Sequence, residues 1–342
     1  MDKDQNVLEM REVSIIYRVG NRIGKAVDRV SFEIKKGEVL GLAGESGCGK
    51  STLAWSILRL LPGNARIVSG DMILEGKNLL KLSERALNDE VRGNKITMII
   101  QNTKDSLNPV FTVGTQMFDL LRFHEQEKQS LIASFNFFRR AKRNKERRFR
   151  CIKMLEEMEI AAADKRFSEY AFQFSGGMRQ RVIMAMNFMA NPAVLIADEP
   201  TTGLDVSVEA YVLELFKSKI RKYETAVIYI THNLRILSEI ADKVAIMYAG
   251  TIVEQAPVEE LFDNPLHPYT KALIKCLPES GVLGEKLQEI PGQVPSIFER
   301  TENCKFQPRC PYSTEICTQA PPRTGKVSSS HFVLCHNFLT VQ

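Results

Sequence analysis

The alternation of apolar and polar positions divides the chain into a strand-rich start, a helical middle and a second strand-rich part. In the first part, polar and apolar residues alternate over 30–34, which is typical of a half-buried strand. The run Val39–Ala43 is apolar without alternation, as expected of a parallel strand covered on both faces. Strands are predicted in this part at 13–17, 30–34, 39–43, 72–74 and 96–100.

The middle of the chain changes to helical spacing with many charges between Thr115 and about Ile160. Strand-like runs then return at 194–197, 226–230 and 244–247, and the first two again lack alternation. We therefore expect an α/β fold with a mainly parallel core sheet, an N-terminal antiparallel β subdomain and a helical insert.

Beyond Gln255 proline becomes frequent, so a C-terminal extension containing several cysteines is expected to begin there. The expected division has four parts. Residues 1–103 form the first part of the core with the antiparallel subdomain, and 104–180 form a helical subdomain. Residues 181–257 complete the core, and 258–342 form the extension.

Composition restricts the class of protein. A chain of 342 residues with 44% hydrophobic residues can bury a sizeable core, and a net charge of +5 is too small to argue for nucleic acid. There is no apolar run of eighteen residues, and the N-terminus carries no signal-peptide pattern. The seven cysteines fit a reducing compartment. We expect a soluble, intracellular chain that reaches a membrane only through partners.

The segment Gly44–Ser51 matches the phosphate-loop pattern G-x-x-x-x-G-K-[ST], and it stands between a predicted strand and a predicted helix over 52–61. Glycines allow successive N–H groups to curl around an oxyanion, and the following helix directs its positive end at the phosphates. Lys50 would reach the β and γ phosphates, and Ser51 would ligate Mg²⁺. The expected ATP-binding residues of this segment are Gly44, Glu45, Ser46, Gly47, Cys48, Gly49, Lys50, Ser51 and Thr52.

Two further motifs end predicted strands. Asp198 and Glu199 follow 194–197, where Asp198 can hold Mg²⁺ and Glu199 can polarise the attacking water. Alternatively, Glu199 is a second carboxylate beside the metal and another group activates water. His232 follows 226–230 and can donate to the γ-phosphate, unless it is a structural histidine.

A second anion site is predicted at Ser175, Gly176 and Gly177, which precede a predicted helix over 178–189. The N–H groups and the dipole of that helix would attract a phosphate.

The order of these motifs resembles the nucleotide-binding subunits of ATP-binding cassette (ABC) transporters. The resemblance implies an ABC-type phosphate-loop (P-loop) NTPase fold, with 1–103 and 181–257 as the two parts of its ATP-binding core and 104–180 as a helical subdomain ending in the signature motif. The resemblance implies that Tyr17 stacks on adenine, although an aromatic in an alternating strand is more often core. It also implies that Gln101 couples Mg²⁺ to the transporter contact, that Ser175–Gly177 is the signature, and that Asp205 lies in a loop crossing a dimer interface. Two such domains would face head to tail, each signature capping the ATP held by the other domain.

A narrower resemblance is to the importers of oligopeptides, dipeptides and, in some members, nickel, and within them to the D-type subunit. It is carried by Phe174–Arg181, Ser106–Pro109, Asn264–Thr270 and Ile290–Gly292. It implies an ATPase on the cytoplasmic face of the membrane. Its expected partners are a second cassette that is a paralogue of this chain, two permeases and an extracytoplasmic binding protein. The alternatives are an importer ATPase for nickel or another small solute, and a soluble ABC ATPase acting on nucleic acid or ribosomes.

Four cysteines crowd into the tail: Cys304, Cys310, Cys317 and Cys335. Their spacing is similar to the one that binds an iron–sulfur cluster in some members, and four thiolates are a complete ligand set for a [4Fe–4S] cluster or for zinc. The alternative is that these thiols are merely buried.

The chain departs from the family at three places. Asn233 and Asn102 replace acidic residues that are usual after the histidine and the glutamine, and Asn233 is expected to cap the helix over 234–241. The stretch 139–150 carries eight basic residues and one acidic residue. It is either a solvated helix face or a surface for anionic lipid headgroups.

Overall fold

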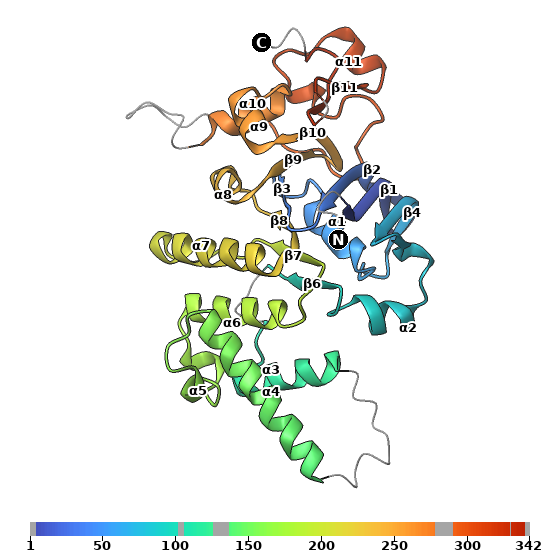
Figure 1. The fold of residues 1–342 in the computed structure, drawn as a ribbon. Coiled ribbons are helices and arrows are strands. Elements are labelled where there is room, and N and C mark those ends of the chain that lie inside the picture. Colours follow the sequence, from blue (N-terminus) through green and yellow to red (C-terminus); the bar gives the residue numbers. More distant parts are fainter. Residues whose placement is uncertain (1–4, 102–105, 126–136, 278–289, 329, 339–342) are drawn as a thin grey trace. The chain divides into compact units, whose positions relative to one another are not determined.

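The computed structural model describes residues 5–101, 106–125, 137–277, 290–328 and 330–338. The chain divides into two compact units, which we describe separately (Figure 1). The first unit combines Met1–Ser83 with Ala226–Gln342, and the second is Glu84–Thr225. The first unit therefore joins the proline-rich C-terminal extension to the N-terminal part of the chain. The expected division into four parts stays a prediction.

The first unit contains most of the strands. Its elements are β1 (Asn6–Val19), β2 (Arg22–Lys35), β3 (Val39–Ala43), α1 (Lys50–Ile57), β4 (Ala65–Leu74), β5 (Lys77–Asn78), η1 (Leu79–Lys81), β8 (Ala226–Ile230), α8 (Leu234–Ile240), β9 (Lys243–Tyr248), β10 (Thr251–Pro257), α9 (Val258–Asp263), α10 (Pro268–Lys275), η7 (Gln307–Arg309), α11 (Glu315–Gln319), β11 (Thr324–Lys326) and β12 (Phe332–Leu334).

Two sheets form in this unit. β2, β1, β4 and β5 make an antiparallel sheet in that order, as the alternation predicted. The second sheet runs β11, β12, β10, β9, β3 and β8, and β3 lies parallel to both β9 and β8. Every residue of β3 and β8 is buried, which explains the absence of alternation in these runs. The tail extends the sheet, because β12 pairs antiparallel with β10.

The second unit is mainly helical (Figure 1). Its elements are α2 (Glu84–Ala86), η2 (Leu87–Val91), β6 (Ile96–Ile99), α3 (Val113–His124), α4 (Phe137–Glu157), α5 (Ala163–Arg166), η5 (Ala171–Gln173), α6 (Gly176–Phe188), β7 (Val194–Asp198) and α7 (Val206–Tyr223).

Helices pack around the short parallel pair β6 and β7 in this unit. α6 contacts β6, α7, α3 and α4, and α4 also contacts α3 and α5. Phe188 of α6 lies 5.8 Å from the ring of Phe216 and 5.5 Å from that of Tyr223, both on α7. The fold is thus the expected α/β class, with an antiparallel N-terminal sheet, parallel core strands and helical insert.

Two helices begin and end at different residues from those expected. α1 was predicted over 52–61 but spans Lys50–Ile57, because Arg59 adopts a left-handed conformation with φ of 51°. α6 was predicted from Met178 but begins at Gly176, because Ser175 caps it. The signature glycines therefore lie inside the first helical turn.

Candidate active site

The phosphate loop connects β3 to α1 in the first unit. Gly44 has a φ of +151°, and a Cβ at this position would lie 2.1 Å from the carbonyl oxygen of Met247. Gly49 has a φ of +114° and stands directly before α1. A side chain at either position would clash with neighbouring backbone, so only glycine allows the chain to turn this tightly around the loop. Lys50 Nζ lies within it and donates to the carbonyl oxygens of Gly44 at 2.6 Å and Glu45 at 3.1 Å.

The first turn of α1 presents Ser51 and Thr52, both half-buried, at the end of this loop. Tyr17 of β1 reaches the same turn, because its hydroxyl lies 3.3 Å from Thr52 Oγ1. The structure therefore brings the proposed adenine-stacking residue beside the phosphate loop. Its role in stacking stays a prediction.

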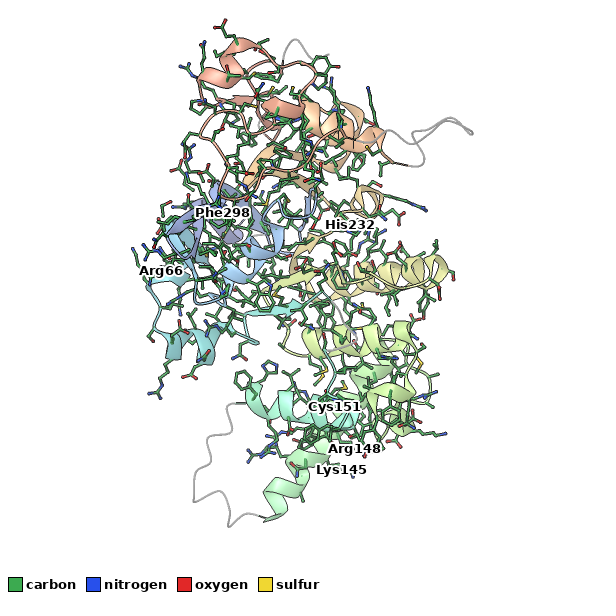
Figure 2. The ribbon with its side chains drawn as sticks, turned by 180° about the vertical axis from the view of Figure 1, so that it is seen from behind. Arg66, Lys145, Arg148, Cys151, His232 and Phe298 are labelled. Carbon is green, nitrogen blue, oxygen red and sulfur yellow. The ribbon has the colours of Figure 1, made fainter. Side chains whose placement is uncertain are left out.

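His232 lies at the same sheet edge as the phosphate loop. β3 and β8 are parallel with Leu42 opposite Ile230, and the N–H of Thr231 donates to the carbonyl of Leu42 at 3.2 Å. His232 follows directly and is exposed; Figure 2 labels it. Asn233 caps α8, accepting from the N–H of Arg235 at 3.1 Å, as expected.

In the second unit, Gln101 and Glu199 meet at the ends of two parallel strands. β6 and β7 are in register from Ile96 opposite Val194 to Ile99 opposite Ala197, so both residues follow the same sheet edge. Gln101 Nε2 donates to Glu199 Oε2 at 2.9 Å. Asp198 is the last residue of β7 and is buried. Asn102, a departure noted in the sequence, lies outside the described residues.

Thr202 is a neighbour of Glu199 that the sequence did not indicate. Its hydroxyl donates to Glu199 Oε2 at 3.1 Å. Glu199 itself has a φ of 48°, a left-handed conformation that is uncommon for glutamate and that occurs often at active sites. The carboxylate is thus held by two donors from different segments.

The signature segment forms the exposed N-terminus of α6. Ser175 Oγ accepts from the N–H of Met178 at 3.3 Å. Gly177 lies against α7, because a Cβ there would approach Val208 to 2.5 Å. Asp205 is exposed at the N-cap of α7. Ser175 and Gly176 are likewise exposed, so this helix end can face an anion.

In the described part of the C-terminal extension, three residues contact the phosphate loop, and the sequence analysis predicted none of these contacts. The Tyr269 hydroxyl accepts from the N–H of Glu45 at 3.0 Å. Arg309 Nη1 donates to Glu45 Oε2 at 3.0 Å, and Arg300 Nη2 donates to the carbonyl of Gly47 at 2.9 Å. The one sequence signal was that Tyr269 belongs to the motif Asn264–Thr270, and that motif gives no indication of a contact with the phosphate loop.

The cysteines give a mixed outcome. Within the described ranges, no group of three or more His, Cys, Asp or Glu side chains is placed to hold a metal ion, so the iron–sulfur expectation finds no support in the geometry. Burial, together with the charges of Cys317 and Cys335, raises the pKa of Cys304 to about 11. Burial and the charges of Cys304 and Cys317 likewise raise the pKa of Cys310.

The basic stretch 139–150 is only partly a solvated face. Arg147 is 2% exposed and donates twice to Glu125 Oε2, at 2.6 and 2.8 Å. Arg150 also pairs with Glu125, at 3.0 Å, and Arg148 pairs with Asp164 at 2.7 Å. Lys145 is exposed; Figure 2 shows it on α4 with Arg148. These arginines therefore serve the packing of the helical unit.

A phosphate loop after β3 and the carboxylates of Asp198 and Glu199 at the end of β7 are the features of a phosphate-loop ATPase. A family model described as "ABC transporter" matches residues 27–202, and one described as "Oligopeptide/dipeptide transporter, C-terminal region" matches residues 253–317. The chain belongs to the ABC transporter family of ATP-binding subunits and is an ATPase of that type.

The chain is similar to several curated proteins over nearly its whole length. It is 40% identical to a probable peptide ABC transporter ATP-binding protein of Sinorhizobium fredii, covering 96% of this chain and 94% of that protein. It is 38% identical to the oligopeptide transport ATP-binding protein OppD of Escherichia coli, covering 92% and 89%. It is 37% identical to the dipeptide transport ATP-binding protein DppD of Haemophilus influenzae, covering 98% and 97%.

Solved structures agree on the fold. A dimeric ATP-binding cassette, MJ0796, in a post-hydrolysis state bound to ADP and Pi is 24% identical, with a TM-score of 0.61 over 73% of this chain and 98% of that one. The protein cbiO1 of Clostridium perfringens, part of an ABC transporter complex, is 23% identical, with a TM-score of 0.62 over 76% and 92%.

Proposed function

We propose that this chain is the energy-coupling ATPase of an importer for oligopeptides or dipeptides. The observation that carries the proposal is the match of residues 253–317 to the C-terminal region of oligopeptide and dipeptide transporters, in a chain whose relatives are named for peptide transport. A chain that serves nickel or another small solute shares the ATPase core. The names of the relatives favour peptides.

In this proposal Lys50 binds the β and γ phosphates, and Glu199 polarises the attacking water while His232 donates to the γ-phosphate. Mg²⁺ would be held by Ser51, Asp198 and Gln101. The donor set fits this ion, because a hydroxyl, a carboxylate and an amide oxygen are the hard ligands that Mg²⁺ prefers. Gln101 directs its NH₂ group at Glu199, which leaves the amide oxygen as the end that can accept.

The proposed partners are a second cassette, two permeases and an extracytoplasmic binding protein. Pairing of cassettes is supported by the exposed N-terminus at Ser175, which could cap an ATP held by another chain. Contact with permeases is supported by an apolar patch on the helical unit. Thr112 bridges to Tyr170, which brings two exposed segments together. The patch consists of Val110, Phe111, Tyr170 and Phe172.

The described part of the chain has no helix both long and apolar enough to cross a membrane. We infer that the protein is held at the cytoplasmic face of the membrane by its permeases. The exposed apolar patch supports such a contact, since large exposed apolar patches often mark protein interfaces.

We also propose that Cys304, Cys310, Cys317 and Cys335 ligate a [4Fe–4S] cluster. The support is the donor chemistry alone, because four thiols are a full ligand set for such a cluster, whereas the described side chains include no group placed to hold a metal ion. The test is an anaerobic preparation analysed for iron, sulfide and visible absorption, with Cys304→Ser and Cys310→Ser as comparisons. A colourless, iron-free wild-type protein would exclude the cluster.

The proposed function is tested by coexpressing the chain with its neighbouring permeases and measuring ATP-dependent uptake of a labelled tripeptide into membrane vesicles. We expect uptake with the wild-type chain and none with Glu199→Gln. Uptake of Ni²⁺ without peptide uptake would indicate the nickel alternative. A chain that neither pellets with membranes nor copurifies with permeases would favour a soluble ABC ATPase.

A further inference from the structure

Glu45, the second residue of the phosphate loop, is held from two directions by the C-terminal extension. Its N–H donates to the hydroxyl of Tyr269 on α10, and its carboxylate accepts from Arg309 at 3.0 Å. Both partners lie more than two hundred residues along the chain, so the contact is purely tertiary. The extension therefore holds the loop at Glu45, a position at which the motif G-x-x-x-x-G-K-[ST] allows any residue.

Arg309 is itself rigidly held. Its side chain is 5% exposed, Nε donates to the carbonyl of Pro291 at 2.7 Å, and Nη2 donates to the carbonyl of Ile290 at 3.1 Å. The guanidinium also lies 5.7 Å from the centre of the Tyr248 ring. The backbone carbonyls of the motif Ile290–Gly292 therefore fix the guanidinium of Arg309. The fixed guanidinium in turn determines where the Glu45 carboxylate lies.

A second arginine of the extension supports the same loop. Arg300 donates to the carbonyl of Gly47 at 2.9 Å and to that of Ala26 at 2.8 Å. It ties the loop to β2 by backbone carbonyls, and these contacts do not involve Glu45.

We propose that Arg309 and Tyr269 are positioning residues of the nucleotide site, acting through Glu45. A carboxylate in a phosphate loop repels the triphosphate, since both carry negative charge. Arg309 compensates that charge and holds the carboxylate in one position. Tyr269 accepts from the N–H of Glu45 and so fixes the backbone at the start of the loop. The extension thus keeps the phosphate loop in the conformation that binds an anion, in addition to any role in transport.

The test is calorimetric titration of Mg-ATP into the purified full-length chain. Arg309→Met leaves Glu45 uncompensated, and we expect its Kd to rise about tenfold, the effect of 1.4 kcal/mol. Adding Glu45→Gln to Arg309→Met removes the unpaired charge, and the Kd should return to within about twofold of wild type. Tyr269→Phe should weaken binding about threefold, because one neutral hydrogen bond is lost.

Arg323→Met, an exposed change in the same extension, is the matched control and should bind as wild type does. If Arg309→Met binds normally, the inference is wrong. If Arg309→Met is folded and weak but Glu45→Gln does not restore binding, the effect passes through the tail alone and the inference is also wrong. Should Arg309→Met not fold, Arg309→Gln, which also removes the charge but keeps an amide donor for the carbonyls of Ile290 and Pro291, carries the same rescue test.

The inference rests on the proposed binding of ATP by this loop, and the two failures are separable. If the wild-type chain does not bind Mg-ATP, the proposed function fails. If the wild type binds and the rescue pattern is absent, only the positioning role fails.

Discussion

The side-chain amide of Gln101 donates to the carboxylate of Glu199 across 2.9 Å, although the two residues are separated by 98 positions in the chain. The contact follows from the parallel pairing of β6 and β7, which ends both strands at one edge. It orients a carboxylate that two other features also mark: its left-handed backbone and the hydroxyl of Thr202 at 3.1 Å. Glu199 is therefore the first residue to substitute in a test of ATP hydrolysis.

Glu199→Gln should keep ATP binding and lose turnover by at least about a hundredfold, because a carboxamide cannot accept the proton of the attacking water. Binding is measured by calorimetry and turnover by phosphate release. Glu239→Gln, on the surface of α8, is the control and should behave as wild type. Undiminished turnover in Glu199→Gln would assign the base to another group.

Cys48 should be alkylated slowly, and the alkylated chain should not bind ATP. The thiol is 0% exposed, and burial raises its pKa despite the nearby charge of Lys50, so little thiolate is available. Once attached, the adduct would occupy the closed phosphate loop. The measurement is iodoacetamide labelling followed by peptide mass spectrometry and Mg-ATP titration, with the half-exposed Cys276 as the internal comparison. Normal binding by a chain verified as labelled at Cys48 would contradict the expectation.

Arg147→Met should lower the free energy of unfolding by about 2 kcal/mol, because it leaves the Glu125 carboxylate without its buried partner. Lys145→Met, an exposed change in the same basic stretch, should alter it by less than about 0.5 kcal/mol. Urea denaturation of both variants separates the packing role from a surface role. Equal effects of the two substitutions would mean that the stretch acts as one solvated face.

His331 should make the stability of the first unit depend on pH. It is fully buried and lies 2.8 Å from Glu254 and 3.1 Å from Glu260. Burial lowers the pKa of His331, but hydrogen bonding to these carboxylates and their charges outweigh burial, so its pKa lies above the ordinary value. The ion pairs therefore contribute fully below the unfolded pKa of about 6.5, and the contribution falls as pH rises through the folded pKa.

The corresponding experiment compares the Tm of the wild type and His331→Gln across pH. We expect the wild type to exceed the variant most at acidic pH, with the gap narrowing as the solution becomes alkaline. A gap that stays constant would show that His331 contributes by packing and uncharged hydrogen bonds only.

Local features of the sequence predicted most of the scaffold. The runs at 39–43 and 226–230 appear as β3 and β8 with the same ends, since a buried parallel strand needs an unbroken apolar run. The G-K-[ST] pattern predicted a loop between β3 and α1, because only glycine tolerates the backbone at Gly44 and Gly49. The first residue of α6 was predicted wrongly, because Ser175 caps the helix two residues earlier than its apolar pattern begins.

The tertiary structure alone decided which tail residues meet the phosphate loop. Arg309 and Glu45 are separated by 264 positions, and neither the periodicity of strands nor the spacing of a motif relates residues so far apart. The same holds for the burial of Arg147, which the charge pattern of its neighbours would place in solvent. Periodicity and backbone constraints act over a few residues, and so the sequence specifies strands, caps and the phosphate loop directly. Side-chain pairs between distant segments depend on the path of the whole chain, which only the folded protein fixes.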